Sequence, residues 1–236
     1  MIMKISPVLL MCGLSMVCIV GYNRYHRCDP APVRYEISTD SLFAPFVQTD
    51  LSEYVASLGA CKVADLIVLV KKQFPVVDTL NLRYCSDGGI HLAVKAQKPF
   101  MLVDEKMVAT IQGTFHPRIF FDESVLAPLP TIFVEGGVEQ CTDSAAFTTF
   151  IRECAAPLCN RYTITWKDKH TVVLVDSNNK ECSIFCRADM PIADALLANI
   201  QQLFDQIKGT IPGKKQWIAD ARFEHQIILY EDKKGA

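Results

Sequence analysis

An uncharged, mostly apolar stretch at residues 5–22 constrains this chain more than any other feature of its sequence. At about 1.5 Å of rise per residue, a helix of that length spans roughly 27 Å, close to the hydrocarbon thickness of a bilayer. The pattern predicts a transmembrane anchor at 5–22, a short tail at 1–4 and a linker at 23–32. The rest of the chain is then expected to fold at a membrane surface.

Two features of the flanks leave other interpretations open. A lone Lys4 before an apolar run also describes a secretory signal peptide, but the residues after the run offer no small-x-small cleavage site, which favours an uncleaved anchor. Three arginines follow the segment, Arg24, Arg27 and Arg34. By charge alone, the positive-inside rule predicts a cytosolic folded part.

Composition limits the number of cores and the class of partner. With 236 residues, 50% hydrophobic and 21% charged, the chain is long enough for two small domains, expected at 33–99 and 100–230, with a tail at 231–236. The formal net charge is −2, and the basic residues are scattered. The charge pattern therefore does not favour nucleic acid as a partner.

The ten cysteines admit several roles. Eight lie outside the expected anchor, an even count that fits disulfides in an oxidising compartment. A zinc site would use Cys154, Cys159, Cys182 and Cys186, but their spacings differ from the short knuckles of structural zinc sites. Cys182 and Cys186 are four apart on an expected strand, where small buried side chains are common. We expect no metal and no cofactor.

The first domain is expected to be a three-stranded sheet with two helices on one face. Asp50 and Glu53 have the spacing of a capping box, and Pro75 closes a stripe of apolar residues at helical spacing. The expected elements are a strand at 33–37, helices at 50–59 and 63–74, and strands at 80–84 and 90–95 joined by a tight turn at 86–89.

The second domain is expected to be an antiparallel, β-rich sheet with two helices, which makes the chain an α+β protein. Its helices should run from Ser144 to Cys154 and from a cap at Asp189, with Pro191 in the first turn, to Gly209. Its strands are expected at 100–103, 108–111, 118–121, 131–134, 162–166, 171–175, 182–186, 217–223 and 226–230.

Catalytic motifs do not emerge from the sequence. The five histidines occur singly, without a second histidine or a carboxylate at metal-ligand spacing. No Gly-x-Ser-x-Gly, phosphate-binding glycine loop or Cys-x-x-Cys occurs. The sequence therefore favours a protein that is not an enzyme.

Two segments carry a resemblance to a known family. Residues 70–80, with the pair Phe74-Pro75, followed by residues 90–99, which close at Lys98-Pro99, resemble the POTRA domain of the FtsQ/DivIB family of cell-division proteins. Residues 220–229, with Asp-Ala-Arg-Phe and then Gln-Ile-Ile-Leu, look like the Asp-Leu-Arg-aromatic segment and final strand of the same family.

This resemblance implies a non-enzymatic scaffold. Members of the family are bitopic proteins of the inner membrane, with their folded part on the extracytoplasmic side. They are enriched at the division septum, support septal cell-wall synthesis, and recruit FtsB/FtsL-type bitopic partners and other divisome subunits. The implied orientation is opposite to the one that the charge count predicts, and a large translocated domain can override a small bias in short flanks.

The last strand is the expected partner-binding site. A terminal strand often lies at a sheet edge, where free N–H and C=O groups can accept a strand from another chain. The expected binding residues are Gln226, Ile227, Ile228, Leu229 and Tyr230, with Arg222 as an ion-pair donor to a partner and Phe223 as an aromatic anchor.

Other roles for these residues and for the chain remain open at this stage. Asp220 is an alternative, internal ion-pair partner for Arg222. The side chains of Phe223, Ile227 and Leu229 alternatively belong to the core. The alternative functions are an envelope assembly or chaperone-type module bearing a POTRA domain, and a thiol or metal protein built on the cysteines.

Overall fold

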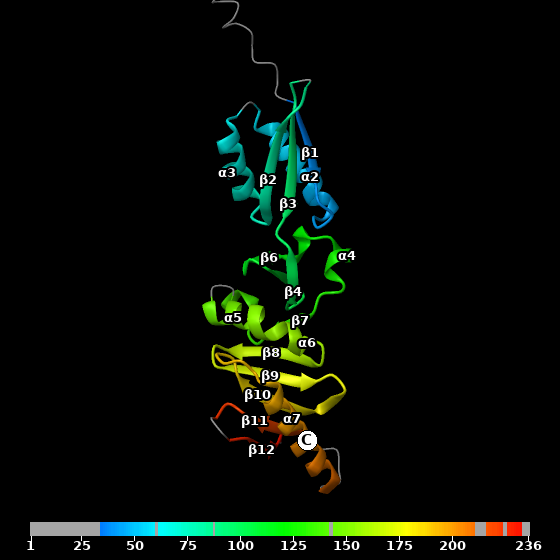
Figure 1. Cartoon of the computed structure of the whole chain (residues 1–236), viewed down its shortest axis with the longest axis vertical. Helices are drawn as coiled ribbons and strands as arrows, with labels where there is room; N and C mark the ends of the chain where they lie inside the picture. The colour runs from blue at the N-terminus through cyan, green and yellow to red at the C-terminus, as the bar shows by residue number, and fades with distance from the viewer. Residues whose placement is uncertain are drawn as a thin grey trace, which may run out of the picture.

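The N-terminal part of the structure is a three-stranded sheet packed against two helices (Figure 1). This computed structural model describes residues 34–59, 61–86, 88–141, 144–210, 216–223 and 226–232. The central strand β3 pairs parallel to β1 and antiparallel to β2, as expected for the strand, helix, helix, strand, strand order. The elements are β1 (Tyr35–Thr39), α2 (Pro45–Ser57), α3 (Val63–Gln73), β2 (Val77–Tyr84) and β3 (Ile90–Ala96).

The start of α2 corrects the expected capping box. α2 begins at Pro45, so Asp50 and Glu53 lie inside the helix and cap nothing. Proline suits a first helical turn, because its φ is already helical and its missing N–H would have had no partner there. The buried side chains of α2 recur every fourth residue: Val47, Leu51 and Val55. In contrast, α3 ends before Pro75 as expected and buries Leu66 and Val70.

The C-terminal part is built on one nine-stranded sheet of order β12-β11-β10-β9-β8-β7-β4-β5-β6. The expected antiparallel meander of β8, β9 and β10 is confirmed. The sheet as a whole is mixed, because β4 and β7, β7 and β8, and β10 and β11 pair in parallel. Its strands are β4 (Pro99–Val103), β5 (Met107–Thr110), β6 (Phe115–Pro117), β7 (Thr131–Val134), β8 (Tyr162–Asp168), β9 (Thr171–Asp176), β10 (Asn179–Arg187), β11 (Trp217–Asp220) and β12 (Ile228–Glu231).

Two helical segments supply most of the side chains that cover this sheet. The first starts at the cap Ser144, whose hydroxyl accepts from the Phe147 N–H at 3.3 Å, and it continues past Cys154 through a π turn before Pro157. The rings of Phe147 and Phe150 pack on Trp166 with centroids at 5.0 and 5.4 Å. The first segment comprises α5 (Ala145–Phe150), η3 (Ile151–Ala155) and α6 (Ala156–Cys159), and the second is α7 (Asp194–Thr210).

Three expectations in this part are wrong. The strand expected at 217–223 is β11, which ends at Asp220 and not at residue 223. Residues 118–121 do not form a strand, since Arg118–Phe120 is a 3-10 turn that follows β6 and Arg118 donates from Nε to Glu123 at 3.0 Å. Asp189 does not cap α7, which begins five residues later. Its carboxylate instead accepts from the Arg187 guanidinium at 3.0 and 2.7 Å, and those hydrogen bonds lower the pKa of Asp189 to about 2.

The two parts share a core at their junction. The Ala44 N–H donates to the Phe120 carbonyl at 3.0 Å, and the Asp122 N–H donates to the Leu42 carbonyl at 2.9 Å. Four residues beyond the expected domain boundary pack with the N-terminal core: Leu102, Val108, Phe121 and Leu126. The boundary at residue 99 therefore separates the two sheets. The hydrophobic core of the N-terminal part extends across it.

His116 at this junction makes a pH-dependent contribution to stability. It is 6% exposed, its Nε2 lies 3.0 Å from the Thr114 hydroxyl, and burial lowers the pKa of His116 from its ordinary value of 6.5. A histidine with a lowered folded-state pKa favours the folded state above pH 6.5, and that contribution is lost as the pH falls, because the unfolded chain binds the proton first. We expect His116→Gln to lose less stability between pH 7 and pH 5 than wild type in urea titrations. Equal losses in both proteins would contradict this, and His170→Gln, at an exposed site, is the control.

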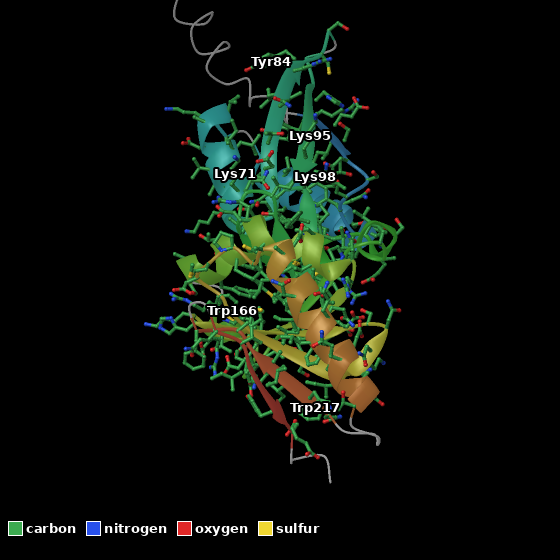
Figure 2. The ribbon with its side chains drawn as sticks, turned by 60° about the horizontal axis from the view of Figure 1, so that its bottom comes forward. Lys71, Tyr84, Lys95, Lys98, Trp166 and Trp217 are labelled. Carbon is green, nitrogen blue, oxygen red and sulfur yellow. The ribbon has the colours of Figure 1, made fainter. Side chains whose placement is uncertain are left out.

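The expected anchor at 5–22 lies outside the described residues. Within the part of the chain that is described, no helix is both long and apolar enough to cross a membrane. Tyr84, the last residue of β2, and Trp217, the first of β11, lie near opposite ends of the view in Figure 2. β12 lies at the end remote from β1, where the described chain begins (Figure 1).

Candidate partner-binding site

β12 is an edge strand, as expected for the last strand of the chain. It pairs with β11, and no described strand lies beyond it in the sheet (Figure 1). The strand comprises four residues, Ile228–Glu231. It begins two residues later than the strand expected at 226–230. The β12 edge therefore offers a short row of main-chain groups to another chain.

The register of β12 decides which of its main-chain groups point outward. The Asp232 N–H donates to the Gln216 carbonyl at 2.8 Å, and Ile228 stands opposite Asp220 in the same ladder. Since hydrogen-bonded and non-bonded pairs alternate in an antiparallel ladder, Ile228, Tyr230 and Asp232 face β11. The N–H and C=O of Leu229 face away from the sheet.

The side chains of the terminal segment alternate between two faces. Ile227 and Leu229 are partly buried against the core, as the alternative interpretation held. Ile228 and Tyr230 are 45% and 39% exposed on the opposite face, and Gln226 is also exposed. An incoming strand would therefore meet the main chain of Leu229, with Ile228 and Tyr230 beside it.

Arg222 is committed to an internal ion pair. Its Nε and one terminal nitrogen donate to the two carboxylate oxygens of Asp220 at 2.9 and 2.6 Å, and its guanidinium carbon lies 5.6 Å from the Phe185 ring centroid. Asp220 is 5% exposed, and its hydrogen bonds with Arg222 lower the pKa of Asp220. This arrangement agrees with the alternative that Arg222 pairs internally with Asp220, and its binding of a partner carboxylate stays a prediction.

Phe223 is half exposed and borders a cavity that the sequence did not indicate. The cavity has a volume of about 280 Å³ and lies where the β10–α7 connection meets the segment after β11. Met190, 43% exposed, and Pro191 form its other side with Phe223. Only the contact between segments thirty residues apart brings these side chains together, so no local pattern could have revealed the cavity.

The zinc site considered for Cys154, Cys159, Cys182 and Cys186 finds no support in the described residues. No group of three or more His, Cys, Asp or Glu side chains there is arranged to hold a metal ion. Burial raises the pKa of Cys159 to about 11 and of Cys186 to about 12, which leaves little thiolate at neutral pH. Cys61, Cys85, Cys141, Cys154, Cys159, Cys182 and Cys186 are free thiols.

No protein-family model matches this sequence, and no curated protein is significantly similar to it.

Proposed function

We propose that this chain is a non-enzymatic scaffold of the bacterial divisome, of the FtsQ/DivIB type. In this proposal the segment 5–22 anchors it in the inner membrane, and the folded parts lie on the extracytoplasmic side at the septum. The outward edge of β12 at Leu229 recruits an FtsB/FtsL-type bitopic partner by strand addition. The observation that carries the proposal is that edge, with Leu229 facing outward between the exposed Ile228 and Tyr230.

Two further observations support it. The N-terminal part has the strand, helix, helix, strand, strand order of a POTRA domain, with Phe74-Pro75 directly after α3 and Lys98-Pro99 where the chain passes from β3 into β4. The β12 edge lies at the end of the molecule remote from β1 (Figure 1). A chain anchored through the residues before β1 would hold that edge away from the bilayer, where a bitopic partner can reach it.

A thiol or metal function is less well supported. Raised pKa values for Cys154, Cys159, Cys182 and Cys186, each caused mainly by burial, disfavour a reactive thiolate. The scaffold proposal predicts that serine at these four positions lowers thermal stability but leaves partner capture per folded molecule unchanged. Co-purification from solubilised membranes, normalised to folded protein, measures this. Loss of capture in a variant that remains folded would favour the thiol function.

The alternative of an envelope assembly module differs in its clients. It predicts binding to unfolded or outer-membrane proteins without enrichment at the septum. The scaffold proposal predicts septal enrichment, which fluorescence microscopy of a tagged full-length chain measures. A uniform distribution around the envelope, with outer-membrane proteins as the main captured species, would replace the scaffold proposal with the assembly module.

A further inference from the structure

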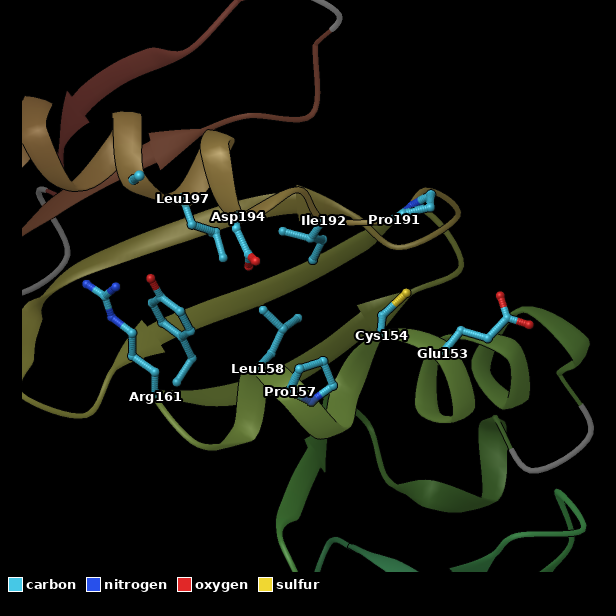
Figure 3. Close-up of a pocket in the computed structure, with 11 residues that line it drawn as sticks. Glu153, Cys154, Pro157, Leu158, Arg161, Pro191, Ile192, Asp194 and Leu197 are labelled. Carbon is cyan, nitrogen blue, oxygen red and sulfur yellow. The ribbon is translucent and has the colours of Figure 1, made fainter.

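A second cavity lies apart from the outward edge of β12. It has a volume of about 320 Å³ and is enclosed by η3 and α6, the start of β8, and the connection that leads into α7 (Figure 3). Leu158, Ile192, Leu197 and Pro157 form apolar walls. Such walls favour the burial of methylene groups.

Asp194 places a carboxylate at this cavity. It lies in the first turn of α7 and points from the helix into the space between Leu158 and Ile192 (Figure 3). The positive end of the helix dipole favours a negative charge in that turn. In the described part of the chain no cation forms an ion pair with it. Asp194 is therefore available to a positively charged group that enters the cavity.

Tyr162 adds an independent polar group to the wall. Its side chain is 4% exposed, and its hydroxyl is the buried side-chain polar atom that has no hydrogen-bond partner within the described residues. A buried hydroxyl without a hydrogen-bond partner destabilises the folded state. Burial raises the pKa of Tyr162, so the hydroxyl stays protonated at neutral pH and can donate or accept. Because Tyr162 forms part of the cavity wall, a bound group is placed to supply the missing partner.

The cation already present at the rim is engaged elsewhere. The Arg161 guanidinium donates from Nε to Asp176 at 3.1 Å and from a terminal nitrogen to Gln201 at 3.2 Å. Its carbon lies 5.2 Å from the Tyr162 ring centroid. The second acid at the rim, Glu153, is exposed and pairs with Arg152 at 3.1 Å. Since Arg161 is held by Asp176, the cavity favours a cation with an apolar stem over an anion.

We infer that this cavity binds a primary alkylammonium group on an aliphatic stem, namely the side chain of a lysine presented by a protein partner. Its methylene groups pack against Leu158, Ile192 and Leu197. Its ammonium group donates to the Asp194 carboxylate, and Tyr162 completes its hydrogen bonding. A lysine stem has four methylene groups, which suit the apolar walls of the cavity better than a compact cation does.

The test uses the full-length protein in detergent micelles without any partner, so its result does not depend on strand addition at β12. Binding of Nα-acetyl-lysine methylamide is measured by calorimetric titration and saturation-transfer NMR. We expect saturable binding, weakened about tenfold by Asp194→Asn, because the charge-assisted hydrogen bond is lost. We expect Tyr162→Phe to weaken binding about threefold and, without ligand, to raise the melting temperature, because the unpartnered hydroxyl is removed.

Matched probes and a matched variant sharpen the test. Asp65→Asn changes the same residue type in the first turn of α3, far from the cavity in sequence and structure, and should leave binding unchanged. Nα-acetyl-norleucine methylamide, which lacks the ammonium group, should bind at least tenfold more weakly. Equal binding of the norleucine and lysine probes, or no effect of Asp194→Asn, would overturn the inference. Tighter binding of cadaverine than of the lysine probe would assign the site to free alkylamines instead.

Discussion

Replacing Leu229 by proline is expected to reduce, by at least about tenfold, the amount of bitopic division protein that co-purifies with this chain from solubilised membranes. The N–H and C=O of Leu229 in β12 face away from β11. Proline removes that N–H and places a ring at the edge where an incoming strand would lie. A tenfold loss corresponds to about 1.4 kcal/mol, within the range of one lost hydrogen bond with an added steric cost.

The matched control for this variant is Leu229→Ala. The Leu229 side chain is partly buried against the core, so both substitutions lose packing, but alanine keeps the outward N–H. We expect the alanine variant to retain most of the capture at equal folded protein. If both variants lose capture equally, the side chain and not the edge carries the interaction. A proline at Ile228 is a poorer probe, since its N–H faces β11 and its loss would damage the sheet.

Removing the guanidinium of Arg222 is expected to destabilise the protein even when no partner is present. Asp220 is 5% exposed, and Arg222→Met would leave its carboxylate buried without its cation. Breaking a buried pair costs about 3–5 kcal/mol, and we expect about 2–3 here because the Arg222 side chain is 37% exposed. Urea denaturation of the full chain in mild detergent measures this loss.

The pH dependence of stability is a second measure of the Asp220–Arg222 pair. The pKa of Asp220 is lowered by its hydrogen bonds with Arg222, so its stabilising contribution is present above its ordinary value of 3.8 and is lost as the pH falls through the lowered value. Asp220→Asn combined with Arg222→Met should cost less than Arg222→Met alone, since no buried charge remains. Arg187→Met, at the exposed pair with Asp189, should cost much less. An Arg222→Met protein as stable as wild type would return Arg222 to the role of a free partner-binding residue.

Local patterns predicted much of the N-terminal part. The apolar stripe that ends at Pro75 and the alternation around the β2–β3 turn define α3 and the hairpin without distant contacts. The start of α2 could not be predicted from the spacing of Asp50 and Glu53, because Pro45 begins the helix before that motif is reached. Two acidic residues at capping-box spacing do not mark the start of a helix when the chain is already helical before them.

The pairings of the large sheet required information that no local pattern holds. β4 joins β7 and β10 joins β11 in parallel, and both pairings link strands separated by long connections. Alternating residues show that a segment is a strand, but they do not show which strand lies beside it. The edge position of β12 was predictable from its place at the end of the chain. The internal pair of Arg222 depends on the burial of Asp220, which only the assembled sheet determines.

The central claim is that the β12 edge meets a bitopic division protein, and the most direct test is photo-crosslinking in living cells from a reactive amino acid placed at Ile228. That side chain is 45% exposed beside the outward-facing Leu229. Val68, 65% exposed on α3, is the matched control position. We predict that mass spectrometry identifies an FtsB/FtsL-type protein crosslinked from Ile228 and not from Val68. Crosslinks from Ile228 to outer-membrane proteins alone, or the same proteins from both positions, would contradict the account.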